Sequence, residues 1–186
     1  MFKIIRLSLL MIVLCGIAYP LAMTGLGQLL FPAQANGSLI ENEKGEVVGS
    51  ELIGQNFNEQ GYFYGRISSI EYDASASGSN NYAPSNADML KRVQQSIAYI
   101  QKEDPNINLK EIPVDLITNS GSGLDPHISV AAAKFQVDRV SKETGINQDT
   151  LNKAIEDTTI PRSLQLFGEP RVNVLKLNME IQGLKK

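Results

Sequence analysis

The stretch LSLLMIVLCGIAYPLAMTGLGQLLF, residues Leu7 to Phe31, decides the organisation of this chain, and it contains no Asp, Glu, Lys, Arg or His. As an α-helix with a rise of about 1.5 Å per residue it would be roughly 36 Å long, and a bilayer core of about 30 Å needs about 20 mostly apolar residues. The stretch therefore predicts a transmembrane helix over residues 7–31. Pro20 lacks a backbone N–H, which predicts a kink there or packing against another membrane helix.

A cleaved signal peptide is the alternative interpretation, because Lys3 and Arg6 form a basic start and residues 33–35, Ala-Gln-Ala, resemble a cleavage site. Signal cores have about 7–15 apolar residues, so the longer uncharged run favours a retained anchor. The only charges before the span are basic, so the positive-inside rule places residues 1–6 in the cytoplasm. We expect a single-pass protein of the cytoplasmic membrane with an extracytoplasmic C-terminal part.

The chain after the span, residues 36–186, is expected to form one extracytoplasmic domain of α+β class, because about 150 residues suit a single core. It has fifteen basic and twenty acidic residues. A nucleic-acid surface normally shows clustered Lys and Arg, so nucleic acid is not an expected partner. Cys15, the only cysteine, lies in the span, which excludes an intrachain disulfide.

The first half of this domain predicts a hairpin, a loop and a helix. Two short strands joined by a turn at residues 42–45 are expected within residues 36–53, because glycine supplies the positive φ of a tight turn. Residues 72–86 are rich in Ser, Asn, Gly and Ala and predict a long loop. Ser85 is a candidate N-cap of a helix over residues 86–103. Its apolar residues are spaced for packing on a core: Leu90, Val93, Ile97 and Ile100.

The second half predicts a strand and further helices. A short strand is expected at residues 112–117, and a helix is expected from Asp125 to Glu143, ending at Gly145. Another helix follows Asn147, and its inward-facing residues are Leu151, Ala154 and Ile155. Residues 171–181 alternate with a phase slip, which leaves strand and helix both open with a preference for strand.

The densest group of small and polar residues is the glycine-rich segment 118–129, TNSGSGLDPHIS. Backbone amides of such a turn can bind a phosphate or carboxylate when a helix starts there. Asp125 opposes this, since its own carboxylate would occupy the helix cap, and a structural strand-to-helix turn is the alternative. The segment has neither a Walker A sequence nor the spacing of a dinucleotide fingerprint.

His127 is the only histidine of the chain. Zinc sites with His or Cys ligands need several such residues, and the nearby serines form no known triad pattern. A hydrolase that uses His127 is therefore less favoured than either a binding and assembly role or a nucleotide-binding role. No catalytic residue and no metal site is predicted.

Six segments spread over nearly the whole chain carry a resemblance to a known family: TGLGQLLFPAQANGSL (24–39), GSELIGQNF (49–57), YFYGRIS (62–68), GSNNYAPSN (78–86), SGSGLDPHIS with AAAKFQVDRV (120–140) and RVNVLKLNM (171–179). In this order they resemble the C subunit of the Kdp-type potassium-transporting ATPase. Gly61, Ile67, Val130 and Asp138 depart from proline positions expected in that family. The resemblance implies an accessory subunit of a high-affinity, ATP-driven potassium uptake pump, and the chain lacks the DKTG motif of the ATP-hydrolysing subunit.

The partners that this resemblance implies are a channel-like potassium-translocating subunit, a P-type ATP-hydrolysing subunit, a small stabilising subunit and the lipid bilayer. The family role is assembly of the complex, or that of a catalytic chaperone that raises the ATP affinity of the hydrolysing subunit. Candidate nucleotide-binding residues for the second role are Ser120, Gly121, Ser122, Gly123, Lys134, Gln136 and Arg139. No cofactor of the chain's own is predicted, and ATP would be met only through the complex.

We favour assembly, because a domain outside the cytoplasmic membrane has no ATP to bind. In this hypothesis the domain covers the ion entrance of the channel-like subunit. An acidic surface there can raise the local potassium concentration slightly, within a screening length of about 8 Å. The residues expected to form it are Glu41, Glu43, Glu46, Glu51 and Asp73.

Overall fold

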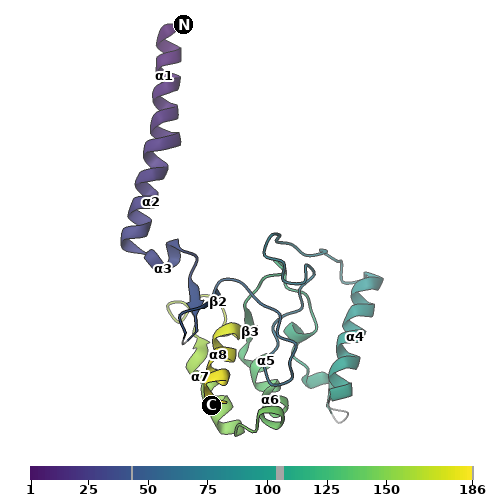
Figure 1. Cartoon of the computed structure of the whole chain (residues 1–186). Coiled ribbons are helices and arrows are strands. Elements are labelled where there is room, and N and C mark those ends of the chain that lie inside the picture. The colour runs from purple at the N-terminus through teal and green to yellow at the C-terminus, as the bar shows by residue number, and fades with distance from the viewer. Residues whose placement is uncertain (43, 104–106, 186) are drawn as a thin grey trace. The chain divides into compact units, whose positions relative to one another are not determined.

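The computed structural model describes residues 1–42, 44–103 and 107–185, which fall into two compact units, residues 1–50 and the chain from Glu51 onward. The first unit begins with α1 (Phe2–Val13), the π-helical turn η1 (Leu14–Ala18) and α2 (Tyr19–Leu30), which form one continuous helix (Figure 1). Among the described residues this is the one helix long and apolar enough to span a membrane.

The helix widens just before Pro20. The N–H of Tyr19 donates to the carbonyl of Leu14, five residues earlier, whereas a regular α-helix uses the carbonyl four residues earlier. Proline lacks an N–H and its ring crowds the carbonyl of the preceding turn, and a π-turn is one way to relieve that crowding. The local disturbance expected at Pro20 takes the form of this widened turn.

The remainder of the first unit is the short helix α3 (Pro32–Ala35) and the predicted hairpin. Its strands are β1 (Leu39–Glu41) and β2 (Val47–Ser50), which pair antiparallel with Leu39 opposite Ser50. Gly45 has a φ of 75°, and the side-chain oxygen of Asn42 accepts the amides of Lys44 and Glu46 at 2.9 and 3.0 Å. The hairpin is therefore confirmed at the expected turn.

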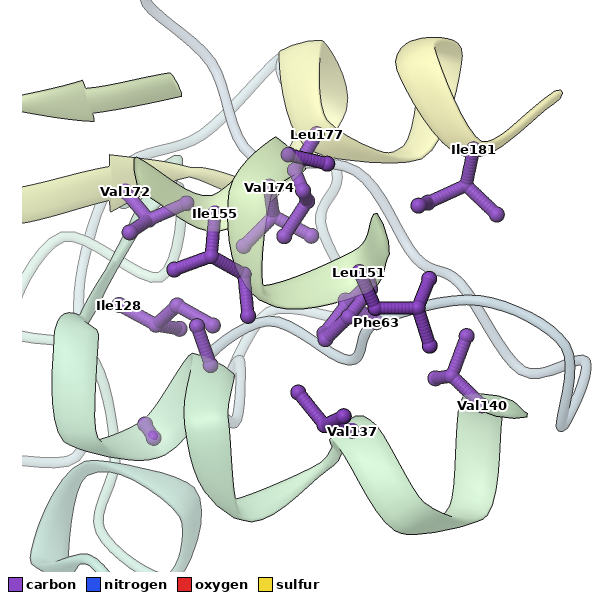
Figure 2. Close-up of a cluster of buried hydrophobic side chains, with 13 residues drawn as sticks. Phe63, Ile128, Val137, Val140, Leu151, Ile155, Val172, Val174, Leu177 and Ile181 are labelled. Carbon is purple, nitrogen blue, oxygen red and sulfur yellow. The ribbon is translucent and has the colours of Figure 1, made fainter. Parts of the chain in front are cut away.

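The second unit contains a three-stranded antiparallel sheet with helices packed around it. The strand order is β3 (His127–Ser129), β5 (Arg171–Asn173), β4 (Thr159–Ile160). The helices that complete the core are α5 (Val130–Phe135), α6 (Val137–Thr144), α7 (Gln148–Thr158) and α8 (Val174–Leu184). Figure 2 shows their side chains converging on Leu151 and Phe63. The buried apolar cluster consists of Phe63, Ile128, Ala132, Ala133, Val137, Val140, Leu151, Ala154, Ile155, Val172, Val174, Leu177 and Ile181.

Several local predictions are confirmed. Gly145 ends α6 in the left-handed conformation, and the side chain of Asn147 caps α7 by accepting the N–H of Asp149. The predicted inward face of α7 is buried. Residues 72–86, all of them described, contain neither helix nor strand.

The helix expected from Asp125 begins five residues later, so that prediction is wrong. Residues 127–129 pair instead with residues 171–173 as strand β3. Ser129 is the true cap, because its hydroxyl accepts the N–H of Ala132 at 3.0 Å. The helix is also not continuous: α5 ends at Phe135, and α6 starts after Gln136.

Two other segments differ from expectation. Residues 112–117 form no strand, because the chain there makes the 3₁₀ turns η2 (Leu109–Glu111) and η3 (Val114–Leu116) on either side of Pro113. At residues 171–181 the preference for strand holds only for β5. The phase slip marks the point where Asn173 caps α8 by accepting the N–H of Lys176 at 3.1 Å.

Helix α4 (Ala87–Glu103) lies at the edge of the second unit (Figure 1). Its cap is Asn86, one residue after the predicted Ser85, and the Asn86 side chain accepts the amides of Asp88 and Met89. The predicted core packing of its apolar stripe is wrong: all of α4 is described, and none of its residues is buried. Leu90 remains 49% exposed.

Candidate functional site

A groove of about 1190 Å³ separates α4 from the body of the second unit. Apolar and aromatic side chains line it together with charged ones. The body contributes residues such as Phe57, Tyr64, Arg66, Phe135 and Arg139, and α4 contributes Arg92, Ser96, Tyr99, Ile100 and Glu103. Since ligand sites in proteins are commonly concave and mixed in this way, the groove is the candidate functional site.

Arg139, on α6, is the centre of the polar contacts in the groove. Its guanidinium lies 3.9 Å from the centre of the Tyr64 ring and donates to the carbonyls of Tyr62, at 3.0 Å, and Gln60. Burial lowers the pKa of Arg139, although a group so basic stays protonated. Its Nε lies 3.8 Å from a carboxylate oxygen of Glu103, so an ion pair joins α4 to the body.

Two buried amide side chains hold the neighbouring segment, residues 62–68. Gln136 accepts the N–H of Tyr64 at 2.8 Å and donates to its carbonyl at 3.2 Å. Asn178, on α8, does the same for Phe63 at 2.8 and 2.9 Å. Because both backbone groups of Phe63 and Tyr64 are satisfied in this way, these two residues need no neighbouring strand.

Arg66, another residue that lines the groove, is held by two contacts. Its guanidinium is 3.1 Å from a carboxylate oxygen of Asp125 and donates to the carbonyl of Asn119 at 3.2 Å. Asp125 also accepts the backbone N–H of His127 at 3.0 Å. Burial by itself raises the pKa of Asp125, but the hydrogen bonds from His127 and Arg66 outweigh it and lower the pKa to about 2.

Several backbone amides of the glycine-rich turn are engaged by its own serine side chains. The hydroxyl of Ser120 accepts the N–H groups of Gly123 and Asp125, and that of Ser122 accepts the N–H of Leu124. Gly123 has a φ of 73°, and a Cβ there would lie 2.6 Å from the side chain of Ile70. The helix start on which an anion site would depend lies later, at Val130. The geometry therefore favours the structural interpretation of this turn.

The predicted nucleotide-binding residues lie in two places. Gln136 and Arg139 line the groove, and Arg139 donates to Gln136 at 2.8 Å. The turn at residues 120–123 and the exposed Lys134 are not among the described residues that line it. Nucleotide binding by these seven residues stays a prediction.

The predicted cation-attracting residues belong to different units. Glu41 and Glu46 lie in the first unit, Glu51 and Asp73 lie in the second, and Glu43 is outside the described residues. Glu51 forms an ion pair with Lys176. Asp73 accepts the N–H of Ser75 at 2.9 Å, which lowers the pKa of its carboxyl group. A shared cation-attracting surface also stays a prediction.

Of the residues that line the groove, only Gln136 and Arg139 were candidate binding residues from the sequence. The hydrogen bonds between Asn178 and Phe63 join residues that are 115 positions apart in the sequence, and no local sequence pattern predicts such a contact. One signal was available: Gln136, between α5 and α6, and Asn178, on α8, are polar residues that stand between inward-facing apolar residues in the sequence. Within the described ranges no group of three or more His, Cys, Asp or Glu is placed to hold a metal ion.

Comparison with known proteins identifies the family. The family model described as KdpC, K+-transporting ATPase, c chain, matches residues 1–183. This chain belongs to the KdpC family. Proteins named potassium-transporting ATPase KdpC subunit from Bacillus cereus, Bacillus thuringiensis and Bacillus anthracis are 58%, 57% and 56% identical to it, over 98% of this chain and 95% of each relative.

KdpC membership confirms the resemblance on which the sequence interpretation rests. The chain is an accessory, non-catalytic subunit of the K+-transporting ATPase complex, and it acts in potassium transport. Its N-terminal apolar helix is a candidate membrane span.

Proposed function

We propose that this KdpC-family chain assembles and stabilises the pump. In this proposal the N-terminal helix spans the cytoplasmic membrane with residues 1–6 inside, and the unit that begins at Glu51 lies outside. There it contacts the channel-like potassium-translocating subunit and covers its ion entrance, while the ATP-hydrolysing and small stabilising subunits complete the complex.

The observation that carries the assembly role is the unburied apolar face of α4. A helix of this amphipathic kind normally buries its apolar stripe in the core of its own domain. Here Leu90 is 49% exposed and Val93, Ile97 and Ile100 are only half-buried. An apolar surface that the domain leaves open is typical of a protein contact, and the other pump subunits are the partners that the family supplies.

A matched pair of variants tests this role. We expect Leu90→Glu to weaken recovery of the intact complex at least about tenfold, because a carboxylate in an apolar contact costs more than about 1.4 kcal/mol. Leu184→Glu places the same charge at a leucine of similar exposure, 44%, on α8, and should leave recovery unchanged. Copurification with a tagged hydrolysing subunit measures both, and equal recovery of the two variants would remove α4 from the proposal.

Nucleotide binding as a catalytic chaperone is the second candidate, and one observation favours it. The Nε atoms of Arg66 and Arg92 are buried and have no hydrogen-bond partner among the described residues, and both side chains line the groove. A phosphate group is a ligand that arginine binds well. Calorimetric titration of ATP into the full chain in detergent separates the two candidate functions. If no binding is detected at millimolar ATP, assembly is the only one of the two that remains.

A further inference from the structure

The loop at residues 161–170, which connects β4 to β5, exposes three large apolar side chains. Leu164, Leu166 and Phe167 are 88%, 70% and 62% exposed. Single exposed apolar residues are common on protein surfaces, but three within four positions at the tip of one loop form a patch. Packing in the core of the second unit does not explain why these three residues are apolar, because they lie outside the buried cluster.

The loop is built to hold this tip in place. Ser163 and Phe167 exchange two backbone hydrogen bonds of 2.9 Å, and Arg162 forms an ion pair of 2.7 Å with Glu169. Leu164 and Gln165 adopt positive φ values of 52° and 61°, which are unfavourable for residues with a Cβ. A strained loop that is held by hydrogen bonds and an ion pair, and that presents apolar side chains to the outside, is typical of a contact surface.

The base of the loop lies beside the residue through which the second unit is tethered. Ile160 pairs with Arg171 at the base. Two residues along the same strand, the Asn173 side chain donates to the carbonyl of Glu51 at 2.8 Å. Glu51 is the first residue of the second unit, so the loop and the tether leave the same region of it.

The tether itself is short. The candidate span ends at Leu30, and antiparallel pairing of the hairpin puts Ser50 opposite Leu39. The hairpin therefore adds almost no reach, and the chain from Leu30 to Glu51 spans at most about 35 Å with α3 intact. This reach sets only an upper limit on the distance between Glu51 and the end of the candidate span, and a limit of this size allows the loop to contact the bilayer surface.

We propose that this loop inserts its apolar tip, Leu164, Leu166 and Phe167, into the interface of that bilayer as a second membrane contact. Tethering raises the effective concentration of the lipid surface, so that a small apolar insertion suffices for stable contact. A fluid surface also needs no complementary pocket. Arg162 and Glu169 are the only ionisable residues of the loop and neutralise each other, so the contact does not require anionic lipid. This inference depends on the membrane anchor and not on the assembly role.

Fluorescence from a labelled cysteine tests the insertion in the full chain. With Cys15→Ser as background, Leu166→Cys is labelled with an environment-sensitive nitrobenzoxadiazole dye and reconstituted in phosphatidylcholine vesicles. We expect blue-shifted emission that lipids carrying a doxyl quencher reduce. Val114→Cys, at an exposed residue of η3 (69%), should emit as in water and resist quenching.

The same measurement in the purified pump complex decides between lipid and protein. Blue-shifted, quenchable emission at residue 166 supports the proposal there too. Emission as in water overturns it. Blue-shifted emission that doxyl lipids do not quench shows that another subunit covers the loop, which also overturns it.

Discussion

At the scale of single residues, two buried amide side chains fix the path of the backbone through residues 62–68 in the second unit. Gln136 and Asn178 are 4% and 2% exposed, and each satisfies both backbone groups of one residue in the segment 62–68. Because an unpaired buried N–H or C=O is costly, these contacts fix both the position and the direction of that segment. They therefore place the Tyr64 ring under Arg139.

Replacing Asn178 by leucine should strongly destabilise the protein. The Asn178→Leu variant keeps a side chain branched at the same atom, although a larger one, and leaves the N–H and C=O of Phe63 unpaired in the core, which we expect to lower the free energy of unfolding by about 2–4 kcal/mol. Thermal unfolding of the full chain in detergent, followed by circular dichroism, measures the change. Gln182→Leu, at an exposed position of α8, is the control, and a similar loss in both variants would contradict the role of Asn178.

Asp125 should make stability depend on pH in the acid range. Its pKa is lowered from 3.8 to about 2 in the folded state, so the unfolded chain takes up the proton first as pH falls. The stabilisation is present above about pH 4 and is lost as the pH falls to about 2. After allowance for solvent screening of this partly exposed group, it amounts to about 1–2 kcal/mol.

The Asp125→Asn variant removes this titration. Its unfolding midpoint, followed between pH 5 and 2, should fall less steeply with acid than that of the parent chain. Asp149→Asn, at an exposed site on α7, should retain the parent slope. An Asp125→Asn curve that runs parallel to the parent curve would show that the pair with Arg66 contributes nothing measurable.

At the scale of elements, the sequence predicts what neighbouring residues decide. The hairpin needs only Asn42 and Gly45, and α7 needs only its cap at Asn147 and the stop at Gly145 before it. These signals act over a few residues, so they can be interpreted without the rest of the chain. The buried face of α7 follows from the same helical period.

The failures arise where distant segments meet. His127 pairs with Asn173, and this contact turns an apparent helix start at Asp125 into a strand. The same pairing divides residues 171–181 into β5 and α8. The stripe on α4 has helical spacing but no core to cover it, and spacing alone cannot show which surface a helix meets. The groove was missed for the same reason, because Tyr64, Arg92 and Arg139 come from three separate segments.

At the scale of the whole molecule, a helix apolar and long enough to span a membrane precedes a separate folded unit that begins at Glu51. The KdpC family places this arrangement in a potassium pump. Which side of the membrane the unit occupies then decides between the candidate functions. Outside, it can meet the ion entrance but no ATP; inside, it can meet ATP but not the entrance. Orientation is therefore the property on which the assembly proposal depends most.

Cysteine labelling determines the orientation. We expect Val114→Cys, in a Cys15→Ser background, to react with a membrane-impermeant maleimide added to intact cells whose outer envelope is permeable to the reagent. A second variant carries the label at the other end of the chain: Phe2→Cys, combined with Lys3→Arg so that residue 3 stays basic, in the same Cys15→Ser background. This cysteine should react only after lysis, because the positive-inside rule places this end in the cytoplasm. The reverse pattern would contradict the proposed orientation and remove the role at the ion entrance. It would also give the groove beside Arg139 access to nucleotide, so the catalytic-chaperone function would become the stronger of the two.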